Sequence, residues 1–189
     1  VCVGNSGQFT MTDGSITGNK ADGSGGGVFV EENATFTMTG GTMTGGTISG
    51  NTASNFGGGV YVKSNTFTVS GPVKITDNCK GGTLDSGTGK YTGGTKNNVY
   101  LLNNNTITID TLAETARIGI TTATTPTAGA PVPFATGATG DLDYAKIFTP
   151  DAADQGYVVN KDGSGNLFLS AHQHSWTYAL KEGTTDTII

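Results

Sequence analysis

The stretch Gly25-Gly26-Gly27-Val28-Phe29-Val30 decides the fold of this chain, because the same phrase returns further along. It reappears as Gly57-Gly58-Gly59-Val60-Tyr61-Val62 and, in a changed form, as Asn97-Asn98-Val99-Tyr100-Leu101. After each copy and a short loop comes a second phrase, whose copies are Phe36-Thr37-Met38-Thr39, Phe67-Thr68-Val69-Ser70 and Ile107-Thr108-Ile109-Asp110. The chain therefore contains an internal repeat.

The spacing of the repeat predicts a β-solenoid. Val1-Cys2-Val3 precedes Phe9-Thr10-Met11-Thr12 at the same offset, and copies of the second phrase follow each other after 27, 31 and 40 residues. Solenoids repeat every ~20–50 residues, and apolar residues at i and i+2 indicate strands rather than helices. A third short strand completes each repeat, as Ser15-Ile16-Thr17, Thr47-Ile48-Ser49 and Lys74-Ile75-Thr76.

These features predict an all-β fold: a right-handed, single-stranded parallel β-helix with three short strands per coil. Right-handed crossovers are the rule for parallel strands. We expect residues 1–120 to form the coils, truncated at the N-terminal end because the chain starts part-way through a repeat. Stacking predicts four interior ladders, namely Val1/Val28/Val60/Val99, Val3/Val30/Val62/Leu101, Phe9/Phe36/Phe67/Ile107 and Met11/Met38/Val69/Ile109.

Asparagine follows the third strand at matching positions, as Asn19, Asn51 and Asn78. Asparagine tolerates the left-handed backbone region, and its amide can bond to copies above and below it. We interpret these residues as a structural asparagine ladder, with a metal site as the alternative.

The composition changes after the coils. Residues 121–140 are rich in Thr, Ala, Pro and Gly, and we expect Pro126, Pro131 and Pro133 to interrupt any strand there. Strands are expected at 143–148, 156–160 and 166–170, and the last two form an antiparallel hairpin that caps the open end of the solenoid. Residues 121–171 are thus an irregular loop and β cap, and 172–189 a tail or linker to a further module.

Charge and composition exclude several classes of function. The net charge of −5 argues against a nucleic-acid partner, and no run approaches the ~18 apolar residues of a membrane helix. Cys2 and Cys79 fall in different coils, beyond the ~7 Å limit between the Cα atoms of a disulfide, so both thiols are expected to be free. We expect a monomer without cofactor or metal.

The order Phe-Thr-Met-x-Gly-Gly-x-Ile-x-Gly-Asn, followed by Gly-Gly-Gly-Val-Tyr-Val, resembles the pectate-lyase-like β-helix repeats of large surface proteins from Gram-positive, often gut-dwelling, bacteria. It is also similar to the repeats of polymorphic outer-membrane proteins and other adhesins. The segment His172-Gln173-His174-Ser175-Trp176-Thr177-Tyr178 resembles one that leads into small β-sandwich modules in such Gram-positive proteins. The resemblance implies a cell-surface or secreted location. Gly71-Pro72 and Asn97-Asn98 depart from the pattern and suggest that the regular helix ends there.

The same fold houses polysaccharide lyases and glycoside hydrolases, so the site must decide whether an enzyme is present. A glycosidase needs carboxylates gathered within ~5–9.5 Å, whereas Asp13, Asp22 and Asp77 lie in predicted turns and Arg117 is the only arginine. We therefore expect no catalytic residue. The sequence favours a non-catalytic structural or adhesive segment that presents a β-helix face to a glycan or host protein, with a fragment of such an enzyme as the alternative.

Two further motifs invite a metal interpretation. His172 and His174 could point the same way from a strand, but zinc usually takes three or four ligands, so we interpret them as part of a polar linker. Asp162-Gly163-Ser164-Gly165-Asn166 lacks the later glutamate of a calcium loop. We interpret it as the turn of the hairpin.

Alternation predicts a candidate binding site. If the valines of the first phrase point inward, then Phe29, Tyr61 and Tyr100 point outward from successive coils, with Cys2 at the start of the row. The rings would then stack at about the ~4.8 Å strand spacing, as a platform for sugar rings or a partner's apolar surface. In the alternative, Gly-rich loops or residues 121–140 fold over the rings and bury them. The exposure of Phe29 and Tyr61 distinguishes the two.

Overall fold

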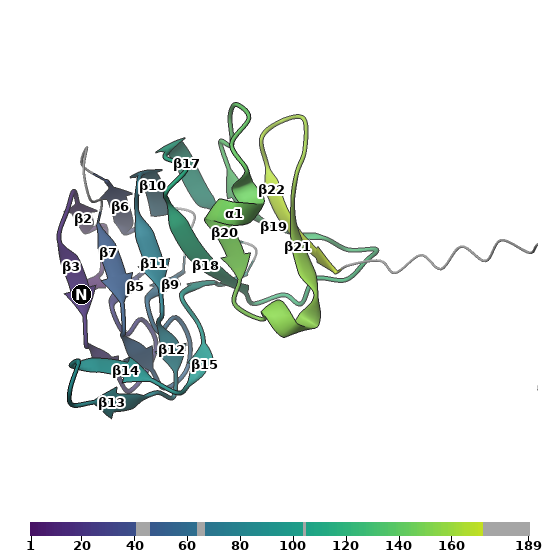
Figure 1. Cartoon of the computed structure of the whole chain (residues 1–189). Coiled ribbons are helices and arrows are strands. Elements are labelled where there is room, and N and C mark those ends of the chain that lie inside the picture. The colour runs from purple at the N-terminus through teal and green to yellow at the C-terminus, as the bar shows by residue number, and fades with distance from the viewer. Residues whose placement is uncertain (41–45, 64–66, 104, 172–189) are drawn as a thin grey trace, which may run out of the picture.

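The computed structural model describes residues 1–40, 46–63, 67–103 and 105–171, and these form a parallel β-solenoid of about 5 turns (Figure 1). Each turn of the regular part contributes strands to several stacked sheets. The predicted all-β parallel β-helix, with antiparallel strands near the C-terminus, is confirmed.

The second phrase of the repeat builds a seven-stranded sheet. Its order is β2-β6-β10-β17-β19-β22-β21, and its strands are β2 (Gln8–Met11), β6 (Thr35–Thr39), β10 (Phe67–Gly71), β17 (Ile107–Leu112), β19 (Val132–Thr136), β21 (Tyr157–Lys161) and β22 (Leu167–Ala171). The first five are parallel in sequence order of the coils.

The first and third strands of the coils share a nine-stranded sheet. Its strands are β1 (Cys2–Val3), β3 (Ser15–Thr17), β5 (Val28–Val30), β7 (Thr47–Ser49), β9 (Val60–Val62), β11 (Lys74–Thr76), β16 (Val99–Leu101), β18 (Arg117–Thr122) and β20 (Phe148–Pro150). The long strand β18 joins the two series, because its first half pairs with β11 and its second half with β16.

Each regular coil also holds a fourth strand that the sequence pattern does not reveal. These two-residue strands, β4 (Lys20–Ala21), β8 (Thr52–Ala53) and β12 (Cys79–Lys80), stack in parallel after the asparagine turns. β15 (Thr95–Lys96) adds to β12 in antiparallel fashion, and the Gly-rich insertion between them forms a separate hairpin of β13 (Thr83–Asp85) and β14 (Lys90–Thr92).

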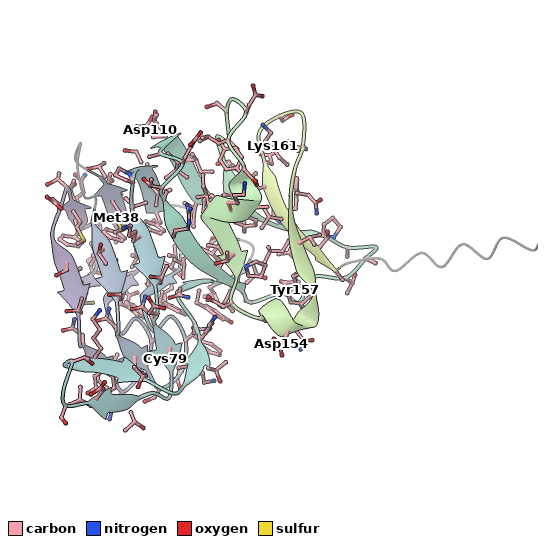
Figure 2. All side chains as sticks on the ribbon, in the orientation of Figure 1. Met38, Cys79, Asp110, Asp154, Tyr157 and Lys161 are labelled. Atoms are coloured by element: carbon pink, nitrogen blue, oxygen red, sulfur yellow. The ribbon has the colours of Figure 1, made fainter. Side chains whose placement is uncertain are left out.

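The predicted register is confirmed by the strand pairs. Phe9 pairs with Phe36, Phe36 with Phe67 and Phe67 with Ile107, and the valine and methionine ladders align in the same way. Met38 lies inside the coils and is fully buried (Figure 2). Two ladder residues are less enclosed, since Val1 is 53% exposed and Phe9 is half-buried.

The structure corrects two expectations beyond the regular coils. Residues 121–140 are not free of strands, since β19 includes Pro133; its pairing with β17 begins only at Ala135, so the missing N–H of the proline breaks no bond of that ladder. Residues 143–148 do not form a strand. They form the one-turn helix α1 (Tyr144–Ile147), which buries Tyr144 and Ile147 and leads into β20.

The antiparallel hairpin of β21 and β22 is confirmed, and β22 also pairs with β19. A short 3-10 turn, η1 (Ala153–Gln155), precedes it. Cys2 and Cys79 are both free thiols, as expected. Among the described residues, no helix has the length and apolar character needed to cross a membrane. The tail with His172 and His174 lies outside the described residues.

Candidate functional site

The predicted asparagine ladder exists, and it is longer than the repeat suggests. The Nδ2 atom of Asn19 donates to Oδ1 of Asn51 at 2.9 Å, and Asn51 donates in the same way to Asn78 at 2.9 Å. Asn78 then donates to Asn98 at 3.1 Å, and Asn98 to Oδ1 of Asp151 at 2.5 Å. Five side chains from successive coils therefore form one continuous series.

Every hydrogen bond in this series points in the same direction. A side-chain oxygen of each later member also accepts the backbone N–H of the preceding ladder residue, for example Oδ1 of Asn78 from Asn51 N at 3.1 Å and Oδ2 of Asp151 from Asn98 N at 2.7 Å. The side-chain amides also donate to backbone carbonyls, since Nδ2 of Asn78 donates to the carbonyl of Ile48 at 2.8 Å. The Oδ1 atoms of Asn51, Asn78 and Asn98 thus each accept two hydrogen bonds from N–H donors. No group of three or more His, Cys, Asp or Glu side chains that could hold a metal ion occurs in the part of the chain that the structure describes.

The glycines of the repeated phrase make room for the ladder. A Cβ added to Gly27 would lie 3.2 Å from Nδ2 of Asn51, and one on Gly59 would lie 2.8 Å from Nδ2 of Asn78. The strand register places Asn98 at the equivalent position of the next coil. The replacement of glycine by asparagine there does not end the solenoid, because the Asn98 side chain fills the ladder position itself.

The sequence pattern does not predict the two residues at the end of the ladder, Gly119 and Asp151. Gly119 lies against Asn98 and Asp151, and a Cβ on it would clash with both side chains. Asp151 occupies the ladder position of the last coil, since Phe148 pairs with Ile118, which pairs with Ile75, and the ladder residue follows three positions later. Only the pairing of β20 with β18 places Asp151 in the ladder. No repeat in the sequence predicts that pairing.

Asp151 is the only ladder member that bears a charge. Its carboxylate accepts hydrogen bonds from the backbone N of Asn98 at 2.7 Å and from Oγ1 of Thr121 at 2.8 Å, besides the Asn98 amide. Burial raises the pKa of the Asp151 carboxyl, and these hydrogen bonds oppose that rise without cancelling it. A cavity of about 310 Å³ lies beside it, lined also by Asp77 and Lys96.

The predicted aromatic row is present, with its rings stacked on one another. The ring centroids of Phe29 and Tyr61 lie 5.1 Å apart, and those of Tyr61 and Tyr100 lie 5.7 Å apart. Phe56, from the loop before β9, stacks on Tyr100 at 4.4 Å. Tyr61 and Tyr100 are each only 8% exposed, whereas Phe29 is half-buried beneath Lys63.

This geometry limits how the row can contact a ligand. The two ring faces of Tyr61 lie against Phe29 and Tyr100, so a sugar ring cannot stack on either of them. Burial and the neighbouring Tyr61 raise the pKa of the Tyr100 hydroxyl. Phe56, at 40% exposure, is the most exposed of these four rings. Ligand binding by Phe29, Tyr61 and Tyr100 stays a prediction.

One groove gathers charges from segments that are separate in the sequence. It has a volume of about 290 Å³ and is lined by Glu114, Arg117, Asp141, Asp143 and Lys146, besides Ile147. Its cations already have partners: Arg117 donates to the carbonyl of Glu114 at 2.7 Å, and Lys146 lies 3.1 Å from Asp143. The salt bridge lowers the pKa of Asp143.

Several other acids stabilise turns. Asp162 accepts hydrogen bonds from the backbone of Ser164 and from both nitrogens of Asn166, which lower its pKa. This is the turn geometry expected for the hairpin. Asp85 caps the tip of the β13–β14 hairpin in a similar way through the N–H of Gly87 at 2.9 Å.

No family model, no curated protein and no solved structure matches this chain.

Proposed function

We propose that this chain is a non-catalytic structural and adhesive segment of a bacterial surface or secreted protein, which presents a β-helix face to a glycan or host protein. The observation that carries the proposal is the use of the repeated polar residues. Asn51 and Asn78 are almost fully buried, and their amides connect one coil to the next. The repeat thus supports a stacked rod, and its lateral faces are the surfaces available to a partner.

The resemblance of the repeated phrase to pectate-lyase-like β-helix repeats supports an extracellular location. In such a location a rod of coils separates a binding face from its anchor. We propose that the chain works as a monomer, because the hairpin of β21 and β22 covers the sheet edge beyond β19. Light scattering during gel filtration tests this, and a stable dimer at micromolar concentration would contradict it.

The experiment that tests the proposed function is a binding screen against a glycan array and purified host matrix proteins. We expect saturable binding to at least one of them. In parallel, polygalacturonate and other acidic glycans are incubated with the chain, with and without Ca²⁺. We expect no reducing ends or unsaturated products above the blank, and their release would contradict the proposal.

The charged groove that contains Arg117 is the observation that supports the alternative function, a polysaccharide lyase or glycoside hydrolase of this fold. A lyase of the pectate type needs acidic ligands for Ca²⁺ beside a Lys or Arg base, and the groove contains Arg117, Lys146 and three acids. If cleavage is observed, Arg117→Gln decides whether the groove is responsible. Lys90→Gln, on the exposed hairpin strand β14, is the matched control.

A further inference from the structure

A straight row of five threonines crosses the outside of the seven-stranded sheet. Thr10 pairs with Thr37, Thr37 with Thr68, Thr68 with Thr108, and Thr108 with Thr136. The row therefore runs along the solenoid axis through five successive strands. With strands spaced ~4.8 Å apart, it extends about 19 Å.

The hydroxyls of this row are available to a ligand. Thr10 and Thr108 are exposed, and the other three are half-buried. Within the described ranges, none of the five hydroxyls bonds to another residue. Threonine is stiff at χ1, and the neighbours of Thr37 and Thr68 along their strands point into the core, as Phe36 and Met38 do. The row is therefore fixed in place before any ligand arrives, which reduces the entropy lost on binding.

The surroundings of the row are polar and almost free of charge. Gln8 and Thr35 pair on one side of it, and Thr39 pairs with Ser70 on the other. Asp110, two residues beyond Thr108 on β17, is exposed at the border. The large apolar side chains of the five strands that carry the row point inward, and the aromatic ring that faces outward on the neighbouring strand β22, Phe168, is half-buried.

We propose that this threonine face binds an uncharged polysaccharide laid along the solenoid axis. The inference rests on the proposed function and names the face and the ligand class. Charge complementarity selects the class: a face of hydroxyls offers donors and acceptors together, which match neutral sugar hydroxyls. The net charge of −5 repels acidic glycans and nucleic acids. The stacked rings of Tyr61 and Tyr100 are not required for this contact.

The test removes hydroxyls without changing shape. The double variant Thr37→Val/Thr68→Val keeps β-branched side chains in the two central positions, and Thr17→Val/Thr47→Val makes the same change on β3 and β7 of the other sheet. Depletion isotherms are measured on microcrystalline cellulose, chitin and galactomannan gel, with polygalacturonate gel as the acidic probe. Thermal unfolding of each variant checks that the fold is intact.

We expect the parent chain to bind at least one neutral polysaccharide and not polygalacturonate. The central double variant should bind about tenfold more weakly, as two lost hydrogen bonds imply, while the control stays within about twofold of the parent. Undiminished binding by Thr37→Val/Thr68→Val overturns the assignment of this face but leaves the proposed function intact. Binding to polygalacturonate alone, or to a matrix protein alone, also overturns the inference. Failure to bind any glycan or matrix protein overturns both.

Discussion

Asn51 shows how much a single side chain contributes to this fold. It accepts two hydrogen bonds from Asn19 and donates to Asn78 and to the carbonyl of Ile16, so it connects three coils. Asn51→Leu leaves buried donors unpaired, and we expect the free energy of unfolding to fall by about 3 kcal/mol. Urea denaturation measures it. Asn55→Leu, at an exposed position, is the control, and equal stability of the two variants would contradict the structural role of the ladder.

Gly119 tests the end of the ladder. Because a Cβ at this position clashes with Asn98 and Asp151, we expect Gly119→Ala to lower the midpoint of thermal unfolding clearly. Gly23→Ala is the matched control, since a Cβ there has nothing within 4 Å. If both variants melt together, the last coil does not have the arrangement described above.

The carboxyl of Asp151 gives the ladder a pH dependence. Burial raises its pKa above the unfolded value of ~3.9, so the folded state holds the proton more tightly. The stability from this group is present at low pH and is lost as pH rises through the raised pKa. We therefore expect the free energy of unfolding of Asp151→Asn, relative to the parent, to increase between about pH 3.5 and pH 7.

The control for this measurement is Asp162→Asn. Hydrogen bonds lower the pKa of Asp162, so its contribution is lost as pH falls, and the relative stability of that variant should change in the opposite direction. If Asp151→Asn follows the same direction as Asp162→Asn, then the hydrogen bonds from Asn98 outweigh the burial of the carboxyl.

The sequence pattern predicts the ladder asparagines that recur in each repeat. It does not predict Asn98 and Asp151, which take their place further along the ladder. Asn19, Asn51 and Asn78 stand out because each follows the third strand at a fixed distance. Asn98 precedes a first strand instead, and Asp151 follows a strand outside the repeat. Both reach the ladder only because the chain folds back into register, which a linear pattern cannot show.

At the scale of the strands, the phenylalanine ladder determines which side is inside. The ring of Phe36 is fully buried and stacks between Phe9 at 5.3 Å and Phe67 at 4.8 Å. Phe36→Asp places an unpaired charge in this stack, and we expect loss of β-structure in several coils by circular dichroism. Phe36→Leu should retain the fold at a lower melting temperature. A parent-like melting curve for Phe36→Asp would show that the inside–outside register is wrong.

Strands were predicted correctly where the alternation of apolar and polar residues is long enough to be recognised in the sequence. The two-residue strands β4, β8 and β12 are too short to show alternation. Pro133 argued against β19, yet the strand accommodates it ahead of the residues that pair with β17. In both cases the strand forms because it pairs with strands that are distant in the sequence. The local sequence pattern does not indicate that pairing.

At the scale of the whole molecule, stability should vary along the axis. A solenoid is held together by contacts between neighbouring coils, and the first coil has such a neighbour on one side among the described residues. We expect amide hydrogens of β1 and β3 to exchange faster than those of β9 and β11, measured by hydrogen–deuterium exchange with mass spectrometry. Uniform exchange in all four strands would indicate one cooperative unit instead.

The direction of the asparagine ladder also bears on how such a rod can change in length during evolution. Duplication of an internal coil adds one more amide that accepts from the coil before it and donates to the coil after it, so the series stays intact. A carboxylate has no hydrogen to pass on, so Asp151 closes the series. The rod can therefore gain or lose whole coils ahead of Asp151 while the last rung stays unchanged.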